Sequence, residues 1–472
     1  MASLDAALLA IDPLEAPTPL TRLGACRFAP LQIATNLQAI PTGLPEVDLF
    51  LSIDESAASE KTERLGLLPL PAPVCHLDDK QEEPSGNFTR EALGIAESAK
   101  VFVSFVHHRR ISSAMLDIWT AILASEPETT LLLHPFSEGV PNEEAMQTLC
   151  RDVDLELASR GIATDRITIF GGHLPNYEDW VAIMRLADVC LDSHPCSYAP
   201  AVSAALDAAI PVVCWTGDQA RMRTGALMLE AEKLGHHIAK TAPDCVTLAC
   251  RLLRDASERQ TIQATLKQAM SEGMVIHDSL AASDAFAALL NSAFDQIALL
   301  GSRGFKADAS PFKVSLPQDP DAIMVEARNL FGSSFNGEAL ARLEQILAVQ
   351  PFRLDARRLM GQVLAKMERH LRAAEYHIAV MQKNPQDAGI WFDLGYSLSN
   401  SGRMQDALQA LEASLRLDDK QVEAWFFLGE LTLKVSNASF AREVAGVLHK
   451  LVPDDDRLRA FEKRIESIES TS

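Results

Sequence analysis

The sequence lacks an excess of basic side chains and any long apolar run, and each absence excludes a class of function. Its 43 lysines and arginines are outnumbered by 64 aspartates and glutamates among 472 residues. This balance argues against a general binder of nucleic acids or membrane surfaces. No window of about 18 residues is uninterruptedly apolar, so we expect no membrane-spanning helix.

Paired cysteines and familiar catalytic motifs are also missing. The eight cysteines are scattered without the paired spacing of a zinc site, which favours reduced core thiols in a cytoplasmic protein. The opening residues lack the basic stretch of a secretory signal, which favours the same location. There is no Walker motif and no G-x-S-x-G nucleophile. We therefore expect no metal ion and no resident cofactor.

The C-terminal third of the sequence carries a repeat of about 34 residues, which is typical of tetratricopeptide units. Small residues recur where paired helices touch, and a proline often follows the second helix of a unit. The positions at this spacing are Ala339, Ala373, Ala407 and Ala441, then Gly361, Gly395 and Gly429, and also Pro351 and Pro385. Such arrays bind peptides or other subunits, so we expect a polypeptide acceptor or a partner protein on the repeats.

Residues 96–301 show short apolar runs that alternate with helical patterns, which predicts a parallel, Rossmann-like sheet. The predicted strands cover 100–106, 129–136, 166–171, 188–195 and 210–217. The predicted helices lie near 113–125, 142–160, 177–187, 200–209, 219–234, 243–270 and 281–299. The fold class is therefore α/β followed by an all-α helical solenoid.

The remaining segments complete the predicted domain organisation. Residues 1–95 contain two apolar runs that favour strands, at 29–36 and 47–53, and are too few for a complete nucleotide-binding domain. We assign them to a truncated first lobe. A linker is expected at 302–319, the repeats at 320–455, and a capping helix and tail at 456–472.

Four basic side chains stand directly after the predicted strand 100–106: His107, His108, Arg109 and Arg110. Ser112 or Ser113 then caps a helix. Open α/β sheets bind their ligands at the carboxyl ends of strands, so this position predicts an anion site. The alternative is a solvated turn that pairs with the acidic surface.

Several segments between residues 27 and 235 carry a resemblance: RFAPLQI, FVSFVHHRRISSAMLDIWTAIL, LLLHPF, RITIFGGHLPNYEDW, LADVCLD and IPVVCWTGDQARMRTGALMLEAEKLG. In order and spacing they resemble the O-GlcNAc transferase/Spindly-type glycosyltransferases, most closely the bacterial branch that glucosylates adhesins in the cytoplasm. The resemblance implies a GT-B arrangement, in which two Rossmann-like lobes hold a UDP-sugar between them. UDP-glucose or UDP-N-acetylglucosamine would be the donor substrate. The acceptor would be Asn, Ser or Thr of a polypeptide.

The resemblance also implies roles for individual residues. Arg110 replaces a family lysine that neutralises the diphosphate leaving group, and His107 and Arg109 would face the same cleft. Tyr177 and Trp180 would hold the uridine, with backbone groups near Pro175 reading the edge of its base. The alternative for Trp180 is a core residue on its helix.

The sequence departs from the family where a helix N-terminus should contact the phosphates. The family has small hydroxyl or amide side chains there, whereas this sequence has Ala199, Pro200, Ala201 and Ala204. Ser197 and Ser203 are the candidate substitutes.

The first lobe departs from the family as well. A family loop with a functional histidine corresponds here to Leu37, Gln38 and Ala39, and about half of the usual lobe is absent. These departures leave two hypotheses open. The chain is a cytoplasmic protein glycosyltransferase with altered phosphate contacts, or it is a catalytically degenerate relative. In the second case it would be a scaffold or partner subunit, for instance of a catalytic paralogue.

Overall fold

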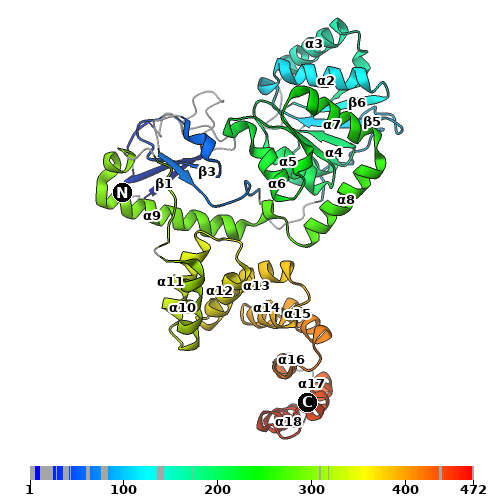
Figure 1. The fold of residues 1–472 in the computed structure, drawn as a ribbon. Helices are drawn as coiled ribbons and strands as arrows, with labels where there is room; N and C mark the ends of the chain where they lie inside the picture. Colours follow the sequence, from blue (N-terminus) through cyan, green and yellow to red (C-terminus); the bar gives the residue numbers. More distant parts are fainter. Residues whose placement is uncertain are drawn as a thin grey trace. The chain divides into compact units, whose positions relative to one another are not determined.

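The computed structural model describes residues 6–10, 25–27, 29–35, 42, 44–59, 64–75, 83–135, 143–172, 174–307, 310–316, 318–434 and 438–469. The chain forms two compact units, residues 1–314 and 315–472 (Figure 1). The first unit contains two parallel sheets with helices, and the second consists of helices. The predicted fold class, a GT-B-like α/β region followed by a helical solenoid, is confirmed.

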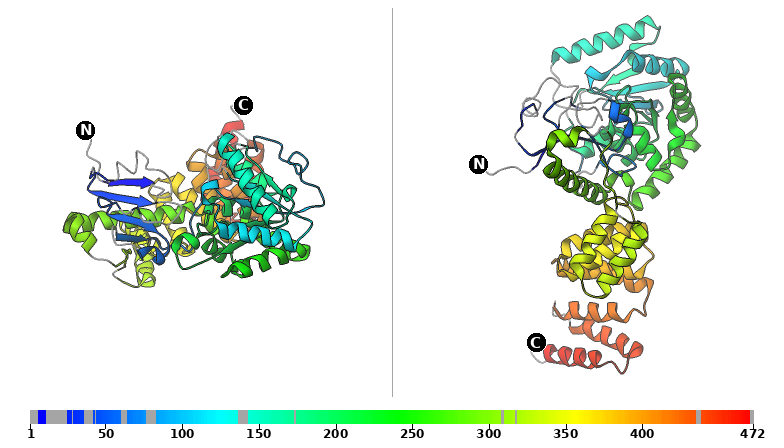
Figure 2. Two further views of the ribbon diagram at one scale, coloured as in Figure 1. Left: turned by 90° about the horizontal axis from the view of Figure 1, so that it is seen from above. Right: turned by 60° about the vertical axis from the view of Figure 1, so that its left-hand side comes forward.

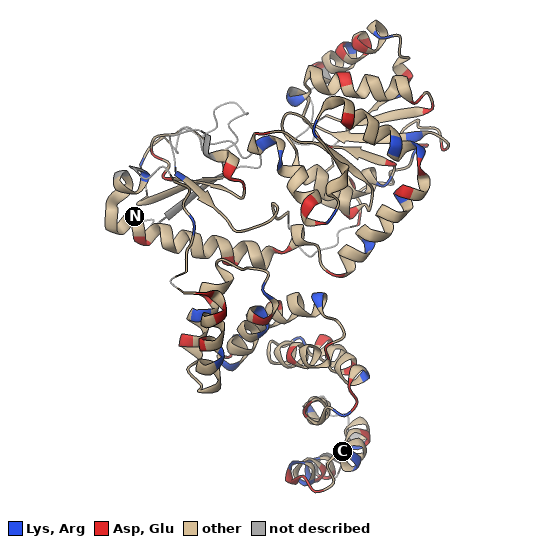
Figure 3. Cartoon of the chain, in the orientation of Figure 1, with Lys and Arg blue, Asp and Glu red and all other residues tan. Residues whose placement is uncertain are grey.

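The larger sheet has the strand order β10-β9-β8-β5-β6-β7, and its pairs are parallel. Apart from Lys100, its strands carry no charged side chain, and most charged residues in Figure 3 lie on helices and loops. All five predicted strands are present, and the short β10 was not predicted. The bounds are β5 (Lys100–Phe105), β6 (Thr129–His134), β7 (Ile167–Ile169), β8 (Val189–Leu191), β9 (Val212–Trp215) and β10 (Ile238–Ala239).

Helices cover both faces of this sheet, with α2 and α7 in mutual contact on one face and α4 and α5 on the other (Figures 1 and 2). The helix predicted at 243–270 is two helices, because Asp255 ends α7 and its carboxylate accepts the Glu258 N–H of α8 at 2.9 Å. The bounds are α2 (Ser113–Ser125), α3 (Glu143–Ser159), α4 (Tyr177–Met184), α5 (Ala199–Asp207), α6 (Thr224–Ala231), α7 (Ala242–Arg254), α8 (Ala256–Ser271) and α9 (Ser279–Ala307).

The smaller sheet has the parallel order β1-β2-β3-β4. The strands predicted at 29–36 and 47–53 are β2 and β3, whereas β1 and β4 were not predicted. One face packs on α9, where Leu31 and Ile33 meet Leu289 and Ala293. The bounds are β1 (Ala6–Ala10), β2 (Leu31–Thr35), β3 (Leu49–Ser52) and β4 (Arg64–Leu67).

The segment predicted as a linker at 302–319 begins inside the first unit. Helix α9 is kinked at Gly301 and continues to Ala307, and Phe312 then joins the edge of the small sheet. The Phe312 N–H donates to the Leu65 carbonyl at 2.7 Å, and its carbonyl accepts the Leu67 N–H at 2.9 Å. The Arg64 guanidinium lies over the rings of both Phe305 and Phe312. Amino-acid composition does not indicate backbone pairing. A polar, glycine-containing stretch is therefore interpreted as a linker from the sequence alone.

The sequence predicts no membrane-spanning helix, but part of α9 meets the length and composition of one. This part is Ser279–Ser302, with a mean hydropathy of 1.2. It carries a buried stripe of Leu289, Ala293 and Ile297 against the small sheet. Alanines and leucines raise its mean hydropathy, whereas serines, Asp284, Asn291 and Asp295 interrupt the apolar run.

The second unit consists of helix pairs at the predicted period. Ala339, Ala373, Ala407 and Ala441 are fully buried. A Cβ on Gly429 would lie 2.5 Å from the Phe461 ring, so glycine allows the C-terminal helix that carries Phe461 to approach closely. The pairs are α10 (Pro320–Gly332) with α11 (Asn336–Leu347), α12 (Leu354–Lys366) with α13 (His370–Lys383), α14 (Ala388–Asn400) with α15 (Met404–Leu417), and α16 (Val422–Lys434) with α17 (Ala438–Leu451). Helix α18 (Asp456–Glu469) follows them.

The repeats contain a buried histidine that should make the protein sensitive to acid. His377 is 1% exposed, and its Nδ1 lies 3.1 Å from the Ser397 hydroxyl. Burial lowers its pKa from 6.5 to about 4, so below pH 6.5 the unfolded chain binds a proton that the folded chain does not. The His377→Phe variant should therefore lose less stability between pH 7.5 and 5.5 than the wild type, by about 1 kcal/mol.

Urea unfolding at the two pH values measures this difference. Equal losses in the wild type and the variant would contradict the assignment of the acid sensitivity to His377.

Candidate functional site

The strand order of the larger sheet identifies the crevice where a ligand is expected. From β5 the chain proceeds outward through β6 to β7, and then returns to β8 on the other side of β5. In open α/β sheets, ligands bind outside the carboxyl ends of the strands at such a reversal. The segments that begin there are residues 106–112 after β5 and residues 192–198 after β8.

The segment after β5 holds the predicted basic residues at this crevice. The His108 N–H donates to the Pro135 carbonyl at 2.7 Å, and a turn then runs from His108 to Arg110. Ser112 caps α2, and its hydroxyl also donates to the His194 carbonyl at 2.9 Å. The two segments at the strand ends are therefore bonded directly to each other.

Arg110 lies beside the N-terminus of α5. Its guanidinium carbon is 5.8 Å from the centre of the Tyr198 ring, and Tyr198 occupies the N-cap position of that helix. The His107 ring is half-buried and 4.3 Å, between ring centres, from the His108 ring. The side chain of Arg109 and the loop residues 37–39 lie outside the described part of the structure. The basic turn is thus at the predicted edge, with Arg110 on the side of α5.

The segment after β8 is organised by Asp192, a buried carboxylate that sequence reasoning missed. One of its oxygens accepts the backbone N–H groups of Ser193 at 2.8 Å and Tyr198 at 3.0 Å. The other accepts the Ser197 hydroxyl at 2.5 Å. Burial raises the pKa of the Asp192 carboxyl, and these hydrogen bonds oppose that rise. An acidic residue directly after an apolar strand was the available sequence signal.

A second layer of contacts joins this loop to α6. The Ser197 hydroxyl accepts the Gly225 N–H at 2.7 Å, and the Ser197 N–H donates to the Arg221 carbonyl at 2.9 Å. A Cβ on Gly225 would lie 2.4 Å from the Asp192 carboxylate, so only glycine permits this approach. The loop at the N-terminus of α5 is therefore fixed from two directions.

The structure corrects the prediction that Ser197 and Ser203 offer hydroxyls to phosphate. Ser197 is 1% exposed and bonded as described above, and Ser203 is fully buried. The Ser203 hydroxyl donates to the Tyr177 hydroxyl at 3.1 Å. Helix α5 thus begins at Ala199 with no hydroxyl in its first turn, although its N-terminus still lies at the crevice.

Tyr177 also differs from its predicted role beside the uridine. Its hydroxyl donates to the Asp207 carboxylate at 2.6 Å, and the ring packs in the main core. Burial, with Asp207 as a second cause, raises the pKa of the Tyr177 phenol well above its usual value. Tyr177 therefore joins α4 to α5, a pairing that residue spacing alone does not reveal.

Trp180 keeps both of the interpretations proposed for it. Its ring lies edge-on to Phe105, with 5.7 Å between centres, and 6.2 Å from Tyr198. It packs against the core yet stays half-buried near the Arg110–Tyr198 pair. Pro175 is exposed just before α4. The structure thus brings Trp180, Tyr198 and Arg110 together and places Tyr177 apart.

Two histidines at strand ends have structural contacts. His134 is 1% exposed and its Nδ1 lies 2.9 Å from the Phe170 carbonyl. The His194 ring stacks on Trp215 with 3.5 Å between centres, and burial lowers its pKa. Both rings are therefore held by contacts within the fold. Among the described residues, no group of His, Cys, Asp or Glu side chains is arranged to hold a metal ion.

The segment after β9 connects the crevice to the small sheet. Ala220 is buried in a cluster with Phe50 and Leu65 of that sheet. Arg223 pairs with Asp54 through its Nε, at 2.6 Å. Residues 220–225 thus contact the smaller sheet and the Asp192 loop at the same time, and sequence reasoning assigned them only to a helix.

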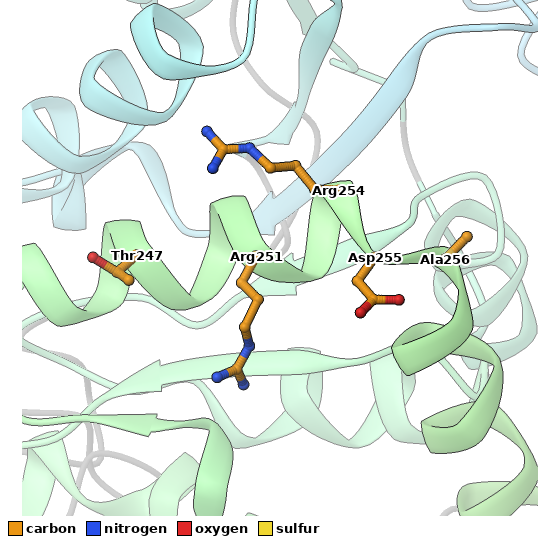
Figure 4. A pocket seen from close by; sticks show the side chains of 5 residues that line it. All are labelled: Thr247, Arg251, Arg254, Asp255 and Ala256. Carbon is orange, nitrogen blue, oxygen red and sulfur yellow. The ribbon is translucent and has the colours of Figure 1, made fainter.

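A surface hollow lies on α7, away from this crevice. Thr247, Arg251, Arg254, Asp255 and Ala256 line it (Figure 4). Arg254 pairs with Glu126, which stands shortly before β6 begins, so the hollow is at the amino edge of the sheet. In Figure 4 the two arginines extend to opposite sides of α7 and do not converge on one ligand.

Comparison with known proteins connects this region to a family of glycosyltransferases. Residues 80–281 match the model of glycosyl transferase family 41, and residues 324–388 and 392–434 match that of the tetratricopeptide repeat. The first match covers the strands and loops that build the crevice.

Relatives share low identity with the chain. A probable UDP-N-acetylglucosamine–peptide N-acetylglucosaminyltransferase SPINDLY of Eustoma exaltatum subsp. russellianum is 25% identical over 253 residues, which are 52% of this chain and 26% of that protein. A UDP-N-acetylglucosamine–peptide N-acetylglucosaminyltransferase of Caenorhabditis elegans is 27% identical over 176 residues, 37% of this chain and 14% of that protein. The chain thus matches about a quarter or less of the length of these relatives.

Solved structures match it more loosely. A mutant O-GlcNAc transferase of Thermobaculum terrenum has a TM-score of 0.45 and 22% identity, covering 60% of this chain and 50% of that one. YrrB, a tetratricopeptide protein with a peptide-binding site, has a TM-score of 0.30 and 21% identity, covering 38% of this chain and 89% of that one.

Proposed function

We propose that the crevice at the carboxyl ends of β5 and β8 binds a UDP-sugar, and that the protein is a protein glycosyltransferase. The observation that carries the proposal is the meeting of Arg110 with the N-terminus of α5 at the strand reversal, 5.8 Å from the Tyr198 ring. This crevice lies within residues 80–281, the stretch similar to family 41. The transferred sugar would be glucose or N-acetylglucosamine, delivered to Asn, Ser or Thr of a polypeptide.

Side chains and a helix end would neutralise the diphosphate without a metal ion. The guanidinium of Arg110 can bind phosphate oxygens in a bidentate manner. The N-terminus of α5 provides partial positive charge through the helix dipole, although the Ala201 and Val202 N–H groups already donate to the Tyr198 carbonyl and Pro200 has no N–H. Trp180 offers a half-buried aromatic surface for the uracil, near the exposed Pro175. Charge that develops on the leaving diphosphate would be stabilised by groups already held in position.

The repeats would hold the polypeptide acceptor or a partner protein. Aromatic rings from the first helices of two successive pairs lie together: the Tyr396 ring is 5.2 Å, and the Phe392 ring 6.2 Å, from that of Phe427. Tyr396 remains 38% exposed. Aromatic surfaces of this kind suit peptide side chains. We place the reaction in the cytoplasm, and an adhesin acceptor remains a prediction from the sequence resemblance.

A second candidate function is that of a catalytically degenerate partner subunit. The observation that favours it is the loss of hydroxyls from the phosphate edge, since Ser197 and Ser203 are buried and α5 opens with Ala199 and Pro200. Pro200 also lacks an N–H for an anion. Such a chain would pair with a complete paralogue and contribute its repeats.

Binding of UDP to the Arg110→Ala variant tests the proposal. Loss of a charge-assisted contact should weaken binding by about 2 kcal/mol, because the phosphate would lose its bidentate partner. Calorimetric titration of the wild type and the variant gives the two dissociation constants. The matched control is Arg251→Ala, which removes an exposed arginine at the opposite edge of the sheet and should leave the affinity unchanged.

The outcome separates the two functions. Micromolar binding that Arg110→Ala removes would support a working donor site. No binding heat at millimolar UDP would reject the glycosyltransferase function and favour the partner-subunit function. Affinity capture of a paralogue would then test the partner-subunit function.

A further inference from the structure

Arg221 is a cation at the crevice that neither the sequence motifs nor the proposed phosphate contacts use. It follows β9 in the turn Ala220–Met222, one strand away from the β5–β8 reversal. Its Nε is buried and has no hydrogen-bond partner among the described residues. A buried donor without a partner is destabilising, so such groups in folded proteins usually bind a ligand, an ion or a water molecule.

The backbone of Arg221 is fixed beside the N-terminus of α5. Its carbonyl accepts the Ser197 N–H at 2.9 Å, and Ser197 directly precedes the N-cap residue Tyr198. Four residues further on, the Gly225 N–H donates to the Ser197 hydroxyl at 2.7 Å. The turn that carries Arg221 is therefore held against the same loop whose Tyr198 ring lies beside Arg110.

The neighbouring arginine of this turn has a different position and partner. Arg223 is paired with Asp54 of the small sheet, and Ala220 is buried in the apolar cluster of that sheet. No carboxylate among the described residues pairs with Arg221. The turn thus uses Arg223 to attach to the first lobe and leaves the charge of Arg221 for another anion.

The residues at the start of α5 indicate which kind of anion Arg221 would bind. The first turn of α5 has no hydroxyl side chain to contact a diphosphate. Arg110 supplies a single positive charge beside it. A nucleoside diphosphate carries charge on two phosphate groups, and each matches the planar fork of one guanidinium. Arg110 after β5 and Arg221 after β9, both on segments that contact the loop before α5, would provide that match.

We propose that Arg221 binds the terminal phosphate of the nucleotide diphosphate, opposite Arg110, and replaces the phosphate contacts that α5 no longer makes. This inference rests on the proposed binding of a UDP-sugar at the crevice. It predicts that the contribution of Arg221 depends on the terminal phosphate, so UDP and UMP respond differently to its loss.

The test compares UDP and UMP binding by calorimetry in the wild type and in Arg221→Met, which keeps a long side chain without charge. The variant should bind UDP about tenfold or more weakly and bind UMP nearly as well as the wild type. Arg221→Lys should recover part of the UDP affinity. The control Arg251→Ala should change neither constant, and thermal unfolding verifies that each variant is folded.

Each other outcome has a definite meaning. Equal weakening of UDP and UMP, or unchanged UDP affinity, would overturn the role of Arg221 while the proposed function stands. No UDP binding by the wild type would overturn both. If Arg221→Met fails to fold, the UDP-to-UMP affinity ratio of Arg221→Lys decides, because a structural role predicts an unchanged ratio.

Discussion

Replacing Asp192 with alanine should destabilise the first unit by about 3 kcal/mol or more, because several buried donors would lose their acceptor together. The carboxylate accepts the N–H groups of Ser193 and Tyr198 and the hydroxyl of Ser197. Each buried donor left unpaired costs about 1–3 kcal/mol, which exceeds the gain from removing a desolvated carboxylate. Urea unfolding of the wild type and the variant measures the difference.

Asp192→Asn is the matched control for this prediction. The amide keeps an oxygen for the two backbone N–H groups and carries no charge that burial would penalise, so its loss should stay near 1 kcal/mol. An Asp192→Ala protein as stable as the wild type would show that the loop after β8 is not held by this carboxylate.

Replacing Gly225 with alanine should also destabilise the protein, by about 2–3 kcal/mol. The added Cβ would lie 2.4 Å from the Asp192 carboxylate and 2.9 Å from both the Cys214 sulfur and the Ser197 hydroxyl. These atoms are buried on fixed backbone and cannot all withdraw. Because Gly225 stands in α6, helix propensity alone predicts the opposite result, a gain of about 1 kcal/mol.

The control for this substitution is Gly235→Ala. A Cβ at Gly235 would meet only the Glu230 side chain, at 3.7 Å, which is an ordinary contact. Thermal unfolding of the two variants should therefore show a lowered midpoint for Gly225→Ala and little change for Gly235→Ala. A raised midpoint for Gly225→Ala would contradict the close packing of α6 against the Asp192 loop.

The sequence predicted most of the fold because its periodic signals were strong. The apolar runs of β5, β6 and β8 and the repeated small residues Ala373 and Ala407 place strands and helix pairs correctly. The strand pairing of Phe312 with β4 was missed, because it joins residues that are far apart in the sequence through backbone atoms alone.

The site was predicted less completely. The position of a residue after a predicted strand indicates at which edge of the sheet it lies, but not which side chains it contacts. The carboxyl end of β5 located Arg110 correctly. Spacing could not show that Tyr177 turns toward Asp207, since the two residues stand on different helices that meet only in the folded chain. The importance of Asp192 and Gly225 depends on three segments that converge only in the folded chain.

The most direct test of the central claim is a crystal structure of the protein with UDP. We predict the diphosphate between Arg110 and the N-terminus of α5, within reach of Arg221, with the uracil near Trp180. UDP bound instead in the hollow lined by Thr247 and Asp255 at the opposite edge of the sheet would contradict the claim. Crystals grown at millimolar UDP that contain no nucleotide would contradict it as well.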